Sequence, residues 1–369
     1  MQQLGRKKVS RLDFILPTIS LILFLIGMLT IYSATYNPVT VSWLTPYGKR
    51  QLLWFCLGLV GMGGSFAIDY QFYQKAAYLL YGFTIILLVL VLLVGKTSMG
   101  ATRWLTVGGI AFQPAELTKL TVVLALSRYL AERRLPPPYN LKELLVPFAL
   151  VGVPFLLVVK QPDLGSAMLI FLISFAVIFY AGITRKTMIT LVAAGISVAM
   201  AGWHFLHDYQ RQRILTFINP DLDPQGTGYH IAQSKIAIGS GGIWGKGFLK
   251  GTQNLLHFLP EQHTDFIFAV FAEQWGFWGS LVLITLFIIF LLRGLAISQE
   301  AKDAFGSYLA VGITATFFWQ VWINIGMVLG LMPVVGIPLP LISYGGTSLL
   351  TSMILIGILL NIHFRKQYF

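Results

Sequence analysis

The sequence predicts an all-α integral membrane protein, a bundle of ten transmembrane helices with one long external loop between helices 7 and 8. The first reason is composition: 56% of the 369 residues are hydrophobic and only 11% are charged, whereas about a quarter of a soluble domain is charged. Such a chain cannot cover its apolar surface with polar side chains, so it must lie in lipid. The second reason is that apolar runs recur from end to end with short connections. We therefore expect a single polytopic membrane domain, residues 1–369.

The expected helices differ in how strongly the sequence supports them. The first run follows a basic tail and is too long for the hydrophobic part of a signal peptide, so we expect a retained helix. The fourth is the least apolar, because it begins with Glu116 and Lys119; it must be tilted or shielded by neighbouring helices. The ten expected helices cover residues 14–35, 51–68, 74–94, 114–131, 144–159, 165–181, 187–206, 266–292, 306–332 and 346–363.

The positive charges predict the orientation. Ten spans place both termini on one side, and 15 of the 26 Lys and Arg residues then lie in cytoplasmic segments, against five in the short external loops. Basic residues in short loops stay in the cytoplasm, so we expect cytoplasmic N- and C-termini. The net charge of +12 is mostly a topology signal, and we expect no nucleic acid partner.

The one long loop, about 207–264, is rich in Gly and polar residues. Long loops in helical bundles usually carry function, and this one is too Gly-rich to form a core of its own. Its stretch "SKIAIGSGGIWGKGFLKGTQ" departs from a nucleotide-binding P-loop at Ser240 and Gly247, so no nucleotide is expected. Its backbone could still cradle a phosphate; the alternative is a flexible loop without a ligand. The single cysteine, Cys56, excludes an internal disulfide.

Ionisable residues near membrane depth are the candidate functional groups. Glu116 and Lys119 are three residues apart and can pair on one helix face, either as a functional site or as a neutral pair that orients helices. Arg103 precedes them on the external side, where its donor fork suits a phosphate, although it could also be an interfacial Arg reaching toward water. Asp163, in a tight external connection, fits a helix N-cap better than a catalytic group.

The stretch "LPEQHTDFIFAVFAEQWG", residues 259–276, places Asp265 at the edge of an apolar run. His257, His263 and Asp265 match no spacing typical of a zinc site. Asp265 could be a helix cap, but its position beside a loop that supplies donors and acceptors favours chemistry. The sequence leaves any metal ligands unknown.

Several motifs resemble one family over nearly the whole chain, from Asp13 to His363. They are "RWL…FQPAELTK", "KQPDLG", "HDYQRQRI", "GYHIAQSKIAIGSGG…GKG", "FLPEQHTDFIFAV" and "PLPLISYGGTS", and together they resemble the SEDS (shape, elongation, division, sporulation) family. The visible variation is "QPAE" where "QPSE" is usual, which removes only the hydroxyl of a serine at Ala115.

The resemblance implies a peptidoglycan glycosyltransferase that polymerises lipid II at the outer face of the bacterial inner membrane, during cell elongation and rod-shape maintenance. It places the catalytic aspartate at Asp265. A class B penicillin-binding protein and other elongasome proteins are the implied partners. A divalent cation, Mg or Mn, is left open as a cofactor. The candidate substrate-binding residues are Arg103, Glu116, Lys119, Arg211, Lys246 and His263.

The chemistry of lipid II agrees with these implications. A sugar hydroxyl is a weak nucleophile near neutral pH, so a carboxylate base helps it attack, and cations offset the charge of the leaving pyrophosphate. Two other classes stay open: a lipid flippase, which would need a polar path past Glu116 and Lys119, and a scaffold for a penicillin-binding protein.

Overall fold

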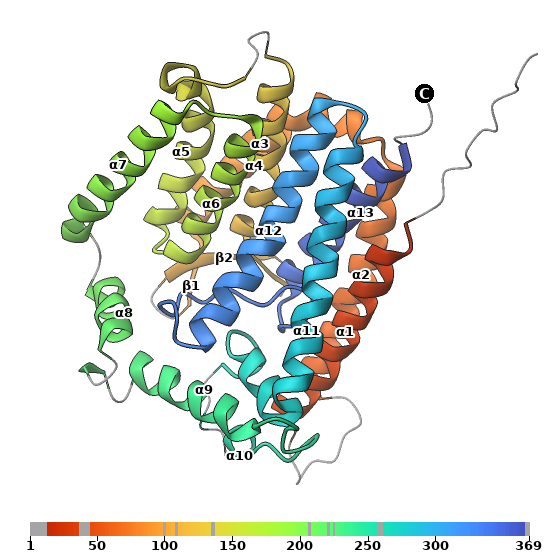
Figure 1. The fold of residues 1–369 in the computed structure, drawn as a ribbon, viewed down its shortest axis with the longest axis vertical. Helices are drawn as coiled ribbons and strands as arrows, with labels where there is room; N and C mark the ends of the chain where they lie inside the picture. The colour runs from red at the N-terminus through yellow and green to blue at the C-terminus, as the bar shows by residue number, and fades with distance from the viewer. Residues whose placement is uncertain are drawn as a thin grey trace, which may run out of the picture.

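The computed structural model describes residues 13–36, 45–98, 101–107, 110–133, 137–205, 208–219, 222–223, 226–256, 258 and 261–365. Figure 1 shows a bundle of long helices along the vertical axis, with short elements gathered at its lower end. The α-helices are α1 (Ile15–Ala34), α2 (Pro46–Ala67), α3 (Tyr70–Val94), α4 (Pro114–Ala131), α5 (Leu145–Lys160), α6 (Leu164–Ala181), α7 (Arg185–Gly202), α8 (Asp208–Ile218), α9 (Thr227–Gly241), α10 (Thr252–Leu255), α11 (Ile267–Glu300), α12 (Ala304–Val328) and α13 (Gly346–Arg365). Two 3₁₀ turns, Leu141–Leu144 and Trp203–Phe205, precede α5 and follow α7.

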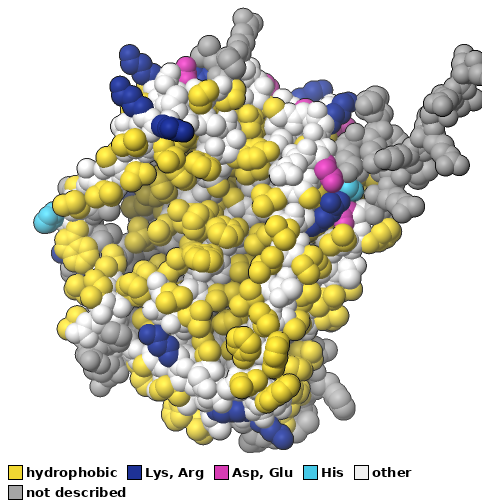
Figure 2. Space-filling model, viewed as in Figure 1, with side chains coloured by type: hydrophobic (Ala, Val, Ile, Leu, Met, Phe, Trp, Pro, Cys, Tyr) yellow, Lys and Arg dark blue, Asp and Glu magenta, His cyan; other side chains and the backbone are white. Residues whose placement is uncertain are grey.

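The prediction of a mostly helical membrane protein is confirmed. Within the described ranges, seven helices are long and apolar enough to cross a membrane: α1, α3, α5 with its 3₁₀ turn, α6, α11, α12 and α13. The other three predicted ranges also form long helices, α2, α4 and α7, but they are less apolar. In Figure 2, apolar side chains cover most of the middle of the visible face, and most Lys and Arg side chains lie near its upper and lower ends. The count of ten spans stays a prediction.

Helix α4 shows why a charged helix can lie inside this bundle. Fourteen of its eighteen residues are buried, including Glu116 and Lys119. It packs against α3, α5, α6 and α12, so neighbouring helices surround it. Thr84 of α3 and Thr121 of α4 share a buried hydrogen bond of 2.7 Å between their hydroxyls. The low hydropathy of α4 is therefore tolerated because protein, rather than lipid, surrounds most of its surface.

Helix α11 is longer than the expected 266–292, because it continues to Glu300. It is broken near its start at Gly276, where φ is 65° and ψ is −158°. A Cβ atom at Gly276 would lie 2.3 Å from the backbone nitrogen of Gly245, and only glycine adopts this conformation readily. The break lets residues 242–247 dock on α11 through backbone bonds such as Phe277 N to Gly242 O at 2.9 Å.

A small antiparallel sheet departs from the all-α prediction. Strands β1 (Lys96–Ser98), β2 (Ala101–Val107) and β3 (Ile110–Phe112) pair in the order β1-β2-β3. Lys96 lies opposite Trp104, and Leu105 lies opposite Phe112. The central strand "ATRWLTV" is rich in Thr, Val and Trp, which favour strands, but its seven residues are too few to outweigh the signal of the flanking helices.

Most of the described residues between about 207 and 264 form helices rather than the loop that the sequence predicts. This segment contains α8, α9 and α10, which Figure 1 shows at the same end of the bundle as the sheet. Ser234 in α9 anchors it, because its hydroxyl donates to Val328 O of α12 at 2.7 Å. The short helices α8–α10 and the sheet therefore lie together at one end of the helical bundle.

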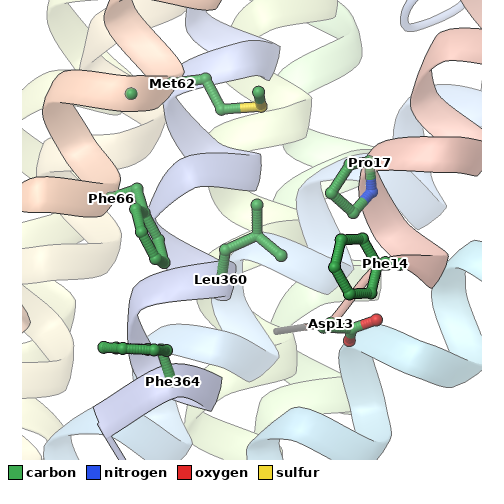
Figure 3. A pocket seen from close by; sticks show the side chains of 8 residues that line it. Asp13, Phe14, Pro17, Met62, Phe66, Leu360 and Phe364 are labelled. Carbon is green, nitrogen blue, oxygen red and sulfur yellow. The ribbon is translucent and has the colours of Figure 1, made fainter. Parts of the chain in front are cut away.

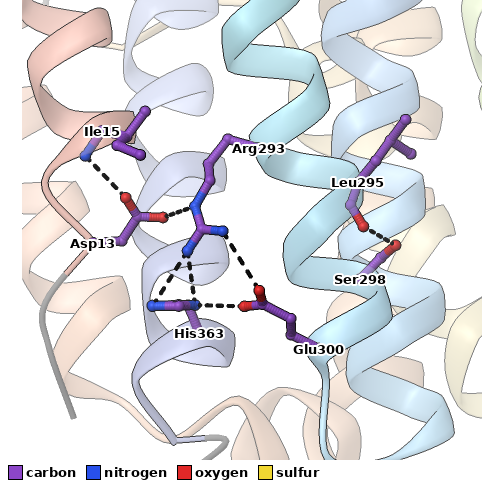
Figure 4. Close-up of polar contacts among 7 residues, drawn as sticks. All are labelled: Asp13, Ile15, Arg293, Leu295, Ser298, Glu300 and His363. Carbon is purple, nitrogen blue, oxygen red and sulfur yellow. Dashed lines mark hydrogen bonds and ion pairs between the residues drawn. The ribbon is translucent and has the colours of Figure 1, made fainter.

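The start of α1 and the end of α13 lie together at the opposite end (Figure 1). Figure 4 shows the polar contacts that join them: Arg293 of α11 pairs with Asp13, and Glu300 lies 3.3 Å from Nδ1 of His363. Asp13 Oδ1 also accepts a 2.9 Å hydrogen bond from Ile15 N. This network ties α1, α11 and α13 at the end away from the sheet.

Candidate active site

A cavity of about 660 Å³ lies between α2, the sheet, the start of α4 and the connection that follows α12. Two carboxylates, one arginine and several aromatic rings reach it, so it combines groups for acid-base chemistry with apolar walls. The residues that line it are Arg50, Leu53, Trp54, Leu57, Trp104, Ala111, Gln113, Glu116, Thr264, Asp265, Gly336, Pro338, Tyr344, Gly345, Gly346, Thr347 and Ser348.

Asp265 lies in this cavity, two residues before the start of α11, with its side chain partly buried. The N-cap position of α11 is Phe266 and carries no side-chain cap, so Asp265 does not serve as that cap. Burial, followed by the nearby charge of Glu261, raises the pKa of Asp265 from the usual 3.8 to about 6, against the opposing fields of Arg213 and Arg103. A carboxyl group with this pKa is mostly ionised at pH 7 and can still accept a proton.

Glu116 lines the same cavity from the start of α4. Its two carboxylate oxygens each lie 2.9 Å from Nζ of Lys119, and the side chains are only 7% and 1% exposed. The structure thus brings these two predicted residues together as a closed ion pair. Replacing only one of the two residues would leave the other charge buried without its partner, which is strongly unfavourable.

Arg103 and Asp163 meet beside the cavity rather than within its lining. Nη2 of Arg103, in β2, donates to Pro162 O at 2.8 Å, and its Nε lies 3.7 Å from Asp163 Oδ2. Asp163 is the N-cap of α6 and accepts from the backbone N–H and the hydroxyl of Ser166 at 3.2 and 2.9 Å. Gln113 donates to the same carboxylate at 3.2 Å. Arg103 is therefore fixed to the start of α6, while its neighbour Trp104 reaches the cavity.

The remaining candidate residues do not line the cavity. Arg211 donates to the carbonyls of Trp203 and His204 at 3.0 and 2.7 Å, which ties α8 to the end of α7. Lys246 Nζ lies 2.7 Å from Oε1 of Glu273. These two cations therefore hold the outer segments in place.

The ring of His263 lies tilted against two tyrosines, with ring centroids 4.5 Å from Tyr47 and 5.7 Å from Tyr344. Burial lowers the pKa of His263 below its usual 6.5, and the field of Glu261 opposes that shift. The lowered pKa disfavours the charged form of the ring, which lies outside the cavity lining and contributes an aromatic contact with these tyrosines. Its backbone carbonyl accepts a 2.9 Å bond from Tyr344 N.

Several cavity residues were missed by the sequence reasoning. Arg50 lies just outside the helix expected at residues 51–68, and its exposed side chain lies at the cavity. The motif "PLPLISYGGTS" supplies much of the wall, including Pro338, Tyr344 and Gly346, although the sequence pattern predicts no role for its individual residues. A cluster of Pro, Gly and Tyr between two apolar runs was the available signal. At Gly346 a Cβ would lie 2.2 Å from the indole of Trp54, so glycine is needed for that contact.

A second, smaller cavity of about 250 Å³ lies at the opposite end, between α1, α2 and α13 (Figure 3). Its lining is apolar except for Asp13, which is already paired with Arg293. The lining residues are Asp13, Phe14, Pro17, Met62, Gly63, Phe66, Leu360 and Phe364. This cavity lacks the acid-base groups of the larger one, which we take as the candidate active site.

Among the described residues, no group of three or more His, Cys, Asp or Glu side chains could hold a metal ion. His257, one of the residues considered for zinc, lies outside the described residues. The carboxylates at the larger cavity are Asp265 and Glu116, and Glu116 is engaged by Lys119. One or two carboxylates together with substrate phosphates are a usual ligand set for Mg²⁺, so the cavity fits a cation that arrives with a phosphorylated substrate.

Comparison with known proteins agrees with these features. The family model for FtsW, RodA and SpoVE, described as "Cell cycle protein", matches residues 13–368. The chain belongs to the FtsW/RodA/SpoVE family. The resemblance inferred from the motifs is confirmed, since this is the same set of proteins that the SEDS name covers.

Relatives in this family match nearly the whole chain. The peptidoglycan glycosyltransferase MrdB of Escherichia coli K12 is 44% identical over 358 residues, covering 95% of this chain and 94% of that protein. Stage V sporulation protein E of Bacillus subtilis 168 is 36% identical over 360 residues, covering 96% and 98%.

Solved structures of family members share the fold. A chain from a peptidoglycan synthase complex, described as coordinating polymerization and crosslinking, superposes with a TM-score of 0.82 at 32% identity, covering 97% of this chain and 98% of that one. The rod shape determining protein RodA of Thermus thermophilus superposes with a TM-score of 0.72 at 30% identity and the same coverage.

Proposed function

We propose that this chain is a peptidoglycan glycosyltransferase that polymerises lipid II into β-1,4-linked glycan strands, in the service of cell elongation and rod shape. The main observation behind this proposal is that Asp265 is a partly buried carboxylate with a raised pKa inside a 660 Å³ cavity. A relative that is 44% identical over almost the whole chain is itself named a peptidoglycan glycosyltransferase, which supports this activity.

In the proposed reaction, the 4-hydroxyl of a GlcNAc attacks the anomeric carbon of the MurNAc of another lipid-linked substrate. The new C–O bond forms as the bond from that carbon to the pyrophosphate oxygen breaks, and undecaprenyl pyrophosphate leaves with the bonding electrons. Asp265 accepts the hydroxyl proton, because its pKa of about 6 leaves it ionised near neutral pH. A single displacement inverts the α linkage of the donor into a β linkage, so no covalent glycosyl-enzyme is needed.

The leaving pyrophosphate gains negative charge, which nearby cations would offset. Arg50 lines the cavity, and Arg103 lies close enough for its field to lower the pKa of Asp265. We assign the first to direct phosphate contact and the second to the electrostatics of the site. A Mg or Mn ion that arrives with the substrate phosphates would add charge neutralisation at the pyrophosphate. Lys246 and Arg211 would act by holding the outer segments around the cavity.

We further infer the membrane arrangement from the long helices at the ten predicted ranges. Helices α2, α4 and α7 would add to the seven apolar ones, and the burial of α4 supports its inclusion. Ten spans put both termini in the cytoplasm, place α8–α10 and the sheet at the outer face of the inner membrane, and open the cavity there. Lipid II would enter with its tail in the bilayer and its sugars in water.

A class B penicillin-binding protein is the proposed partner, with other elongasome proteins around the pair. Support comes from the structural neighbour that belongs to a complex combining polymerization with crosslinking. The partner would supply the transpeptidase, since the candidate site of this chain contains groups suited to glycosyl transfer.

The decisive experiment is polymerisation of lipid II by the purified chain with its partner, comparing wild type with Asp265→Asn. Asn keeps the size of the side chain but cannot accept the proton, so a loss of about 10² to 10⁴-fold is expected. Glu261→Gln is the matched control at pH 7, because it removes a carboxylate four residues away and leaves Asp265 ionised at that pH. A rate for Asp265→Asn above about a tenth of wild type would remove Asp265 from the chemistry. Absence of any polymer from the wild type, with lipid II appearing on the other leaflet of vesicles, would favour a flippase.

A further inference from the structure

Asn324, in the last turns of α12, joins two loops that meet at the candidate active site. Its side chain is fully buried at 0% exposure. The Nδ2 atom donates two hydrogen bonds, to Asp265 O at 2.9 Å and to Ile337 O at 2.7 Å. Asp265 precedes α11, whereas Ile337 belongs to the α12–α13 connection, residues 329–345. One amide group therefore holds the backbone of the candidate base to the segment that forms the facing wall.

The orientation of this amide follows from its partners. Both neighbours are backbone carbonyls, which only accept hydrogen bonds, so the nitrogen rather than the oxygen of Asn324 must face them. Both amide hydrogens are then used. An amide –NH₂ is the uncharged side-chain group that can give two hydrogen bonds from one nitrogen, which explains why an asparagine suits this buried position.

The α12–α13 connection lies directly against the Asp265 side chain. A Cβ atom at Gly336, where φ is 73°, would be 3.4 Å from Asp265 Oδ2. Ser343 joins the same connection to the turn that precedes α11, because its hydroxyl donates to Thr264 O at 2.7 Å. The same hydroxyl accepts a 2.8 Å hydrogen bond from Leu339 N within the connection. The position of the carboxylate thus depends on how the two segments are held together.

Asn324 does not line the cavity, so it would influence substrate only through Asp265 and the wall. Ser343 and Tyr344 hold the carbonyls of Thr264 and His263, but the carbonyl of Asp265 itself is held by Asn324. We infer that Asn324 is a positioning residue for glycosyl transfer, whose amide keeps the Asp265 carboxylate at the place where the acceptor hydroxyl must lie. This inference rests on the proposed function of Asp265.

The test uses three variants of the full chain with its partner. Asn324→Leu keeps a similar volume and removes both donors, whereas Asn324→Asp, protonated when buried, can donate at most one hydrogen bond. Thr316→Val is the matched control: it lies on the same helix, is 2% exposed, and its hydroxyl bonds only within α12, to Gly312 O at 2.9 Å. Two readouts are needed, the kcat and KM for lipid II, and hydrogen–deuterium exchange of peptides that cover residues 261–268 and 333–345.

A displacement of about 1 Å in an active site can lower the rate about 10²-fold. Asn324→Leu is therefore expected to lower kcat by at least about tenfold with KM unchanged, and to speed exchange in both segments. Asn324→Asp should fall between wild type and Asn324→Leu, and Thr316→Val should match wild type in both readouts.

The outcomes separate this inference from the proposed function. Unchanged exchange in Asn324→Leu would overturn the inference, as would faster exchange with normal kcat. Exchange that rises across all helices, with KM and kcat both altered, would show a general folding role and overturn it as well. If Asp265→Asn is inactive while Asn324→Leu is normal, only the inference fails; if Asp265→Asn is active, the general base and the inference fail together.

Discussion

The raised pKa of Asp265 predicts an acid limb in the pH–rate profile of polymerisation. The base must be ionised to accept a proton, and burial together with Glu261 raises its pKa from 3.8 to about 6. With a pKa of 6, about 90% of the carboxylate is ionised at pH 7 and about 9% at pH 5. The rate should therefore fall about tenfold between pH 7 and pH 5. An unshifted carboxyl group would stay about 94% ionised at pH 5 and would produce almost no change.

The electrostatic causes can be tested separately. Glu261 raises the pKa of Asp265, so Glu261→Gln should move the acid limb to lower pH while the rate at pH 7 is retained. Arg213 lowers this pKa, so Arg213→Gln should move the limb to higher pH. The two shifts in opposite directions are a signature that a general loss of stability would not produce.

The assay is the initial rate of glycan-strand formation by the purified complex at subsaturating lipid II, from pH 4.5 to pH 8, since this regime reports the ionisation of the free enzyme. Gel filtration of the complex at each pH controls for dissociation. A rate that stays constant down to pH 5 with an intact complex would refute the reasoning. An acid limb that Glu261→Gln leaves unshifted would show that Glu261 does not contribute to the pKa of the titrating group.

Three further predictions concern the same site. Arg103→Ala should lower polymerisation and leave the complex with its partner intact, because it removes a cation beside the cavity. A wild-type rate with unchanged lipid II affinity would contradict this. Arg103→Lys keeps the charge and tests the contribution of the guanidinium hydrogen bond to Pro162. Replacing either Glu116 or Lys119 alone should lower the melting temperature and the activity more than replacing both. Removing one partner of a buried ion pair lowers the free energy of unfolding by about 3–5 kcal/mol. Additive effects in a double-mutant cycle would count against the pair. For Asp265→Asn, the raised pKa means that ionisation destabilises the folded state from pH 3.8 upward and fully above pH 6. The variant should therefore be inactive but more stable at pH 7, by at most about 3 kcal/mol, and a lower melting temperature than wild type would argue otherwise.

The sequence predicted the long helices because their signal is local. Runs of about 20 apolar residues and the distribution of Lys and Arg depend only on composition within a window. The Glu116–Lys119 pair was also within reach, since residues three apart lie on one helix face. Asp163 at the start of α6 followed from the preference of Asp for N-cap positions.

Other parts depend on contacts between distant segments and could not be predicted in this way. The sheet at residues 96–112 is too short for its alternation to outweigh the flanking helices. That Arg211 and Lys246 bind substrate stays a prediction. Their partners are the carbonyls of residues 203–204 and the buried Glu273, which are not identifiable from spacing. The role of Asn324 likewise depends on a carbonyl 59 residues away.

The place of Asp265 reflects two opposing requirements of its chemistry. A base that serves near neutral pH needs a pKa close to that pH, which here comes from burial and the neighbouring Glu261. The same burial makes the ionised form unfavourable in the folded state, so the turn would relax toward water if it were free to move. The bonds from Asn324 to Asp265 O and from Ser343 to Thr264 O oppose that movement. The carboxylate can therefore stay poorly solvated because its backbone, rather than its charge, is held by the neighbouring helix and connection.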